Sequence, residues 1–199
     1  MKRTLFALAA ASLAAPALAQ DTRALDAHVH GVTTAEIAVE HGRVEINLLS
    51  PGMDIVGFEY EASTAADKEA VAAAIRQFLA PESIVTLPEA AGCRLTEVLA
   101  HLHSGDHEGE HGEEDHGDHA DHDDGHGHDD HDDHGEGAEH SAFHVTYGFA
   151  CEDEGTLTTI GFPFFDRFAN AQEIEVQYVT ETGAGMAEVI RSTPELSLE

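Results

Sequence analysis

One segment limits what this chain can fold into more than any other, namely the 37 residues from 104 to 140. It contains 16 Asp and Glu, ten His, eight Gly, two Ala and one Ser. Its only apolar side chains are methyl groups, so it cannot bury enough surface to offset the conformational entropy lost on folding. We therefore predict a long disordered loop at 104–140 that interrupts an ordered domain.

The same segment carries much of the charge of the chain. The 199 residues include 39 Asp and Glu against nine Lys and Arg, a formal net charge of −30. This balance argues against nucleic-acid binding, because a phosphate backbone requires a basic footprint, and against docking on anionic lipid. Without the segment, the remaining residues have the composition of an ordinary, mildly acidic domain.

The histidines of the segment predict metal binding. Imidazole and carboxylate groups are the ligands that first-row divalent metals use, so zinc is expected, with nickel and copper as alternatives. Because a disordered chain must become ordered at each binding event, we expect several weak-to-moderate sites, for about three ions. An acidic spacer that only solvates the chain is the alternative, but it would not need ten histidines. These are His107, His111, His116, His119, His122, His126, His128, His131, His134 and His140.

Five further histidines are candidates for a preformed site. His28 and His30 are two residues apart, and His101 and His103 repeat that spacing just before the segment. Residues two apart in an extended chain project from the same face. His144 is expected on the non-core face of its strand. Three of these histidines, converging with a carboxylate or an open fourth position, would form a zinc site; the alternative is ordinary surface histidines.

The first residues have the features of a secretory signal. Lys2 and Arg3 precede an apolar run at 5–13 that is too short to span a bilayer, and residues 17–19 have the small side chains that a signal peptidase accepts. We predict a signal peptide at 1–19, a periplasmic location and no membrane insertion of the mature chain. An uncleaved anchor is the alternative.

Export determines how the two cysteines are interpreted. In an oxidising compartment, Cys93 and Cys151 are expected to form a disulfide that holds both roots of the inserted segment together. Ligation of a metal by the two thiolates is the alternative.

Alternating patterns predict an α+β domain with a mainly antiparallel sheet and one or two helices. A helix is expected to begin at its cap, Thr64, and to end at Pro81, and a short helix carries the aromatic residues at 162–168. Both halves, 20–103 and 141–199, show hairpin, helix and strand in that order, which is typical of an internal duplication. Strands are expected at 35–39, 44–48, 54–60, 95–99, 143–149 and 174–178.

Catalytic motifs are not found in the sequence. It has no HExxH helix and no Gly-rich phosphate loop. Acid–base residues are abundant only where the chain is not expected to be rigid, and catalysis requires rigid placement. We therefore predict that the protein is not an enzyme.

A series of short motifs recurs in order through the segments that are expected to be folded. They are Ala27-His28-Val29-His30-Gly31, Ser50-Pro51-Gly52, Val56-Gly57-Phe58-Glu59, Ala91-Gly92-Cys93, His140-Ser141-Ala142-Phe143-His144 and Phe164-Phe165-Asp166-Arg167-Phe168. Together with the inserted segment, they resemble the ZrgA-type periplasmic zinc-uptake proteins over nearly all of the mature chain. One departure, Ala184 in place of the expected Gln, touches no proposed ligand. The resemblance implies an accessory protein that helps to supply zinc to a high-affinity import system.

The resulting hypothesis is a periplasmic zinc buffer or chaperone that supports zinc uptake. Its expected partners are divalent metal ions and, from the resemblance, a zinc ABC importer or its binding protein. Two alternatives stay open: a protein that sequesters copper or nickel, and a metal-switched interaction module for a transporter.

Overall fold

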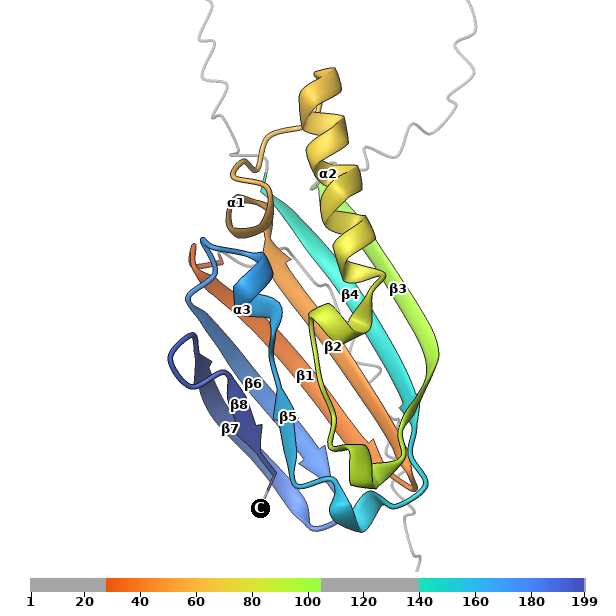
Figure 1. The fold of residues 1–199 in the computed structure, drawn as a ribbon. Coiled ribbons are helices and arrows are strands. Elements are labelled where there is room, and N and C mark those ends of the chain that lie inside the picture. The colour runs from red at the N-terminus through yellow and green to blue at the C-terminus, as the bar shows by residue number, and fades with distance from the viewer. Residues whose placement is uncertain (1–27, 105–139, 199) are drawn as a thin grey trace, which may run out of the picture.

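The computed structural model describes residues 28–104 and 140–198. Six strands form the main sheet in the order β3-β4-β2-β1-β6-β7, and β5 pairs with β8 in a second, two-stranded sheet (Figure 1). The strands are β1 (Val32–Glu40), β2 (Arg43–Pro51), β3 (Arg94–Ser104), β4 (Ser141–Ala150), β5 (Thr159–Gly161), β6 (Glu173–Thr180), β7 (Gly183–Ile190) and β8 (Glu195–Ser197). The helices are α1 (Gly52–Ile55), α2 (Ala65–Phe78) and α3 (Phe164–Arg167), with 3₁₀ turns at Pro81–Ser83, Glu89–Ala91 and Glu154–Thr156.

Most neighbouring strands of the main sheet are antiparallel. The exception is β1 with β6, which run parallel with Val32 opposite Glu173. The mainly antiparallel α+β fold predicted from the sequence is therefore confirmed. The hairpin of β1 and β2 forms because His41 and Gly42 both adopt positive φ in the turn between them.

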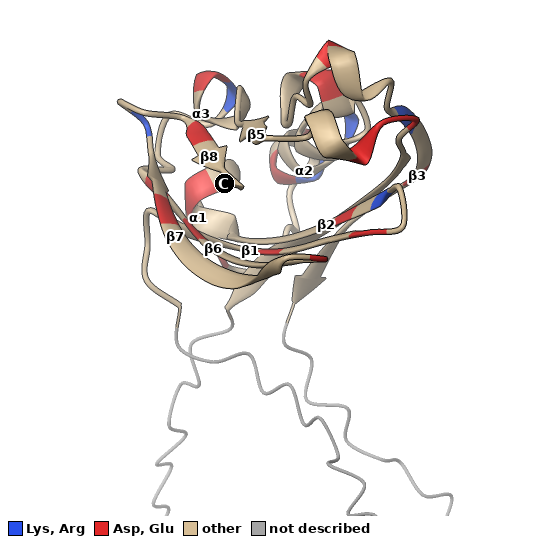
Figure 2. Cartoon of the chain, turned by 90° about the horizontal axis from the view of Figure 1, so that it is seen from below, with Lys and Arg blue, Asp and Glu red and all other residues tan. Residues whose placement is uncertain are grey.

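The helices and the small sheet cover one face of the main sheet, as Figure 2 shows. Within residues 28–104 and 140–198, no element covers the other face, which we call the open face. Strand alternation explains the difference: residues of β1, β2, β4 and β6 that face the helices are mostly apolar and buried, and their neighbours on the open face are mostly polar.

The core lies between the helices and the covered face. The aromatic rings predicted at 162–168 pack there, with Phe168 4.9 Å from Phe78 and 5.0 Å from Phe164 between ring centroids. The buried Tyr147 hydroxyl donates a hydrogen bond to the carbonyl of Phe78 at 2.7 Å, which satisfies its polar group. This contact ties β4 to the end of α2.

Helix α2 begins at the cap that the sequence predicts. The Thr64 hydroxyl accepts a hydrogen bond from the Asp67 amide, and the Asp67 carboxylate accepts one from the Thr64 amide. The helix ends at Phe78, before Pro81.

The strand predicted at 54–60 is wrong. The chain instead forms the single turn α1 and then a segment without regular structure that carries Glu59. At Gly52, a Cβ atom would lie 2.5 Å from the Ser141 hydroxyl and 2.7 Å from the Phe58 carbonyl. The absence of a side chain therefore lets the turn pack directly against β4, a tertiary contact that alternation of residues cannot reveal.

The disulfide between Cys93 and Cys151 is confirmed, which removes the alternative of thiolate ligation. Its predicted place at the roots of the inserted segment is wrong. The bridge joins residues next to the start of β3 and the end of β4. Ser104, the first residue of the insertion, pairs with Ser141, which follows the insertion, at the opposite end of this hairpin. Ten residues of strand at about 3.3 Å each separate the two ends by about 30 Å.

Several predictions concern residues outside the described part of the chain. These are the signal peptide at 1–19 and the inserted segment, of which only Ser104 and His140 are described. They stay predictions, as does the internal duplication. Among the described helices, none is both long and apolar enough to cross a membrane.

Candidate metal centre

Two of the predicted histidines lie beside the start of β1 and contact the same carboxylate. The Nε2 atom of His28 is 2.6 Å from Oε1 of Glu59, and Nε2 of His30 is 3.2 Å from that oxygen. The Glu59 side chain is only 10% exposed, whereas that of His30 is 55% exposed. A nearly buried carboxylate thus meets two imidazoles at the edge of the fold.

A third imidazole that contacts Glu59 comes from the C-terminal end of the inserted segment. His140, the last residue of that segment, places Nδ1 3.0 Å from Oε2 of Glu59. Its ring centroid is 5.0 Å from that of His28. Residues 28, 59 and 140 are remote in sequence, so the fold itself assembles this group of three histidines and one glutamate, which we call the metal centre.

The Glu59 carboxyl is held in its ionised form by these neighbours. Burial by itself would raise its pKa, but the hydrogen bonds with His140, His28 and His30 outweigh burial and lower the pKa to about 2. The carboxylate is therefore available as an anionic ligand at any pH at which the histidines are neutral enough to bind a metal.

The geometry of the group fits a tetrahedral zinc ion. Two ligand atoms that are each about 2.0 Å from such an ion lie about 3.3 Å from one another. The nitrogens of His28 and His30 lie 2.6 and 3.2 Å from Oε1 of Glu59, and that of His140 lies 3.0 Å from the other oxygen, Oε2. One nitrogen of His28, one of His30 and one oxygen of Glu59 all lie within 4.8 Å of one another. His140 is outside this group of three, because its Nδ1 contacts the other Glu59 oxygen, Oε2, so its ring would have to turn to supply a fourth ligand.

A buried aspartate fixes the turn that carries His28 and His30. Both carboxylate oxygens of Asp54 accept hydrogen bonds from the Gly31 amide, each at 2.8 Å. The Gly31 carbonyl accepts from the amides of Gln172 and Glu173. Gly31 has φ +91°, a conformation that other residues rarely adopt. Asp54 and β6 therefore hold this glycine from two sides and orient the two imidazoles.

We expect Asp54→Asn to weaken zinc binding by about tenfold, because groups that orient metal ligands typically contribute 10–100-fold to affinity. Zinc affinity measured by competition with a chelator checks this, with the exposed Asp166→Asn as the matched control. Unchanged affinity in Asp54→Asn would contradict a positioning role, even if its melting temperature fell.

The other predicted histidines occupy different places. His101, His103 and His144 lie together on the open face of β3 and β4, apart from the metal centre. The remaining histidines of the inserted segment, other than His140, fall outside the described residues. Sequence reasoning missed both Glu59 and Asp54 as functional residues. Glu59 stands within one of the quoted motifs, and that was the signal that could have found it.

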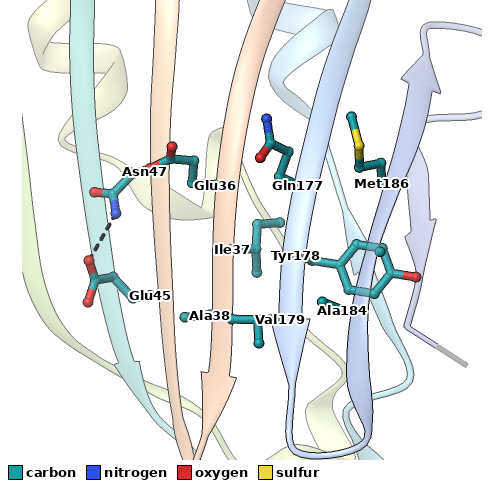
Figure 3. A pocket seen from close by; sticks show the side chains of 11 residues that line it. Glu36, Ile37, Ala38, Glu45, Asn47, Gln177, Tyr178, Val179, Ala184 and Met186 are labelled. Carbon is teal, nitrogen blue, oxygen red and sulfur yellow. Dashed lines mark hydrogen bonds between the residues drawn. The ribbon is translucent and has the colours of Figure 1, made fainter. Parts of the chain in front are cut away.

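A hollow on the open face does not belong to the metal centre. Figure 3 shows its lining, which comes from β1, β2, β6 and β7. It includes the carboxylates of Glu36 and Glu45, and Glu45 accepts a hydrogen bond from Asn47. Because the lining residues include no histidine or cysteine, the hollow lacks the nitrogen and sulfur ligands that zinc prefers.

His28, His30 and Glu59 are a candidate metal site. The model of the ZrgA family of zinc uptake proteins matches residues 27–198. The chain belongs to that family. Among curated proteins, none matches the chain.

Proposed function

We propose that this protein is a periplasmic zinc buffer or chaperone that supports high-affinity zinc uptake. The observation that carries the proposal is the convergence of His28, His30 and His140 on the nearly buried carboxylate of Glu59. His28, His30 and Glu59 supply three ligands, and His140, which contacts the same carboxylate, supplies the fourth of a tetrahedral ion once its ring turns toward it. A centre closed in this way suits retention of zinc.

The inserted segment supplies the second part of the proposed function. Its histidines and carboxylates form a reservoir of weaker sites, and His140 is both the last residue of that segment and a member of the metal centre. Ions collected by the segment therefore arrive beside the tightest site of the protein. From there the proposed acceptor is a zinc importer or its binding protein.

The ligand set and the family match favour zinc over the sequestration of copper or nickel. Soft thiolate and thioether ligands select Cu(I), and in the metal centre the contacts to Glu59 come from imidazoles alone. Imidazole and carboxylate also bind Cu(II) and Ni(II), so the preference for zinc over these two ions rests on the match to the family of zinc uptake proteins.

A growth assay tests the proposed function. A strain that lacks the protein is grown in zinc-limited medium and complemented with wild type, Glu59→Gln or the exposed control Glu61→Gln. We expect wild type and Glu61→Gln to restore growth and Glu59→Gln to fail. Protein recovered from the periplasm should contain zinc in excess of nickel and copper. Full rescue by Glu59→Gln, or a predominance of copper or nickel in the recovered protein, would refute the proposal.

A further inference from the structure

A second group of imidazoles lies on the open face of the main sheet. His101 on β3 and His144 on β4 are directly opposite one another in the strand register, with ring centroids 5.3 Å apart. His103 is two residues further along β3, and its centroid is 5.7 Å from that of His144. His101 and His103 are exposed, and His144 is half-buried.

The distances between ring centroids are in the range of imidazoles that share a metal ion, although the ring nitrogens do not converge as closely as those of His28 and His30 do. Zinc binds a histidine nitrogen at about 2.0 Å, and the ring centre lies about 1.1 Å further out, so two imidazoles on a tetrahedral ion have centroids about 5 Å apart. The metal centre shows the same range, with 5.0 and 5.8 Å between its rings. The rings of His101 and His144 are nearly parallel, at 18°. Coordination therefore requires His101 to turn about χ2, a torsion with a broad energy profile.

The positions around the three histidines carry no charge that would oppose a cation. Leu49 is opposite His144 on β2, Ala142 is opposite His103, and Leu99 and Thr146 pair with one another on the same face. Among the described residues, these three imidazoles are the groups on this part of the open face that could bind an ion. Since such an ion would lack the carboxylate that the metal centre provides, its affinity should be lower.

We propose that His101, His103 and His144 form a second zinc site, with three imidazole ligands and a fourth position open to solvent. His140 precedes His144 by four residues, about 13 Å of extended chain, so both sites can hold an ion at once. Ser104, the first residue of the inserted segment, pairs with Ser141 next to His103. An open position allows an incoming ligand to bind before the old ones leave, so the second site exchanges its ion more readily than the metal centre does.

Residue-resolved modification of the full-length protein tests this proposal. Histidines are labelled with diethyl pyrocarbonate over a series of buffered free zinc concentrations, and mass spectrometry reports the reactivity of each one. This readout separates the second site from the histidines of the inserted segment. We expect zinc to protect His101 and His103 at higher concentrations than it protects His28, and to leave the exposed turn residue His41 reactive.

Two substitutions make the test decisive. His144→Asn should raise the zinc concentration that protects His101 and His103 at least tenfold, with His28 unchanged. His101→Asn, at an exposed position that cannot threaten the fold, should do the same for His103. Glu59→Gln should remove the protection of His28 by zinc but keep the protection of His101. Loss of zinc binding at the metal centre can therefore be distinguished from loss of binding at the second site. The proposal is overturned if His101 stays as reactive as His41 at saturating zinc, or if His101→Asn leaves His103 protected as before.

Discussion

Replacing Glu59 by glutamine is expected to remove the stabilisation that zinc gives to the folded protein. Glu59 is the one group that all three histidines of the metal centre contact. Glutamine keeps its shape but not its negative charge, so the ion loses its anionic ligand. Substitution of a residue that only hydrogen-bonds to a metal ligand typically lowers metal affinity 10–100-fold. Loss of a ligand itself should therefore lower the affinity at least about 100-fold.

The expected size of the stabilisation by zinc follows from mass action. At a free zinc concentration 100 times the dissociation constant, binding to the folded state alone adds about 2.7 kcal/mol to the free energy of unfolding. If affinity falls 100-fold, the same zinc concentration adds only about 0.4 kcal/mol. The inserted segment, expected from the sequence to have no fixed fold, binds ions in the folded and unfolded chains alike and contributes little to this difference.

Denaturant unfolding with and without zinc measures this increment. The exposed Glu61→Gln is the matched control and should keep the full increment of the wild type. The zinc-free stability of each variant is measured separately, so that a change in the fold itself is not mistaken for a change in binding. An increment in Glu59→Gln equal to that of the control would contradict the assignment of Glu59 as a ligand.

The histidine pattern predicted the chemistry of the metal centre but not its composition. His28 and His30 stood out because they are two residues apart and outside the inserted segment. Glu59 did not stand out among 39 acidic residues, and the segment around it was wrongly predicted as a strand. Its position depends on the contact of Gly52 with Ser141, which exists only once β2 and β4 are paired.

The fold was more predictable than the site because strand alternation is a local signal. The apolar face of β4, from Phe143 to Tyr147, is buried as its pattern indicates. Alternation was misleading at the sheet edge, where Leu95 and Leu99 are exposed and Val98 and Leu102 face the core. An edge strand pairs with one neighbouring strand only. Packing therefore constrains the residues on its open face weakly, and apolar residues can be exposed there.

The second large effect is expected from the disulfide. Cys93 and Cys151 are 58 residues apart in sequence, and closing a loop of that length in the unfolded chain is worth about 4 kcal/mol in the chain-entropy model. Cys93→Ala/Cys151→Ala should therefore lower the free energy of unfolding by about 4 kcal/mol. Reduction of the wild type, which opens the bridge without removing side-chain volume, is the control and should cause most of the same loss.

Because the bridge lies about 30 Å along the β3–β4 hairpin from the roots of the insertion, its loss should not alter the metal centre. Zinc should therefore add the same increment to the free energy of unfolding in the double variant as in the wild type. Denaturant unfolding in the presence and absence of zinc measures both quantities in one experiment. A smaller increment in the double variant would show that the two ends of the hairpin are coupled. An unchanged free energy of unfolding without zinc would contradict the stabilising role of the bridge.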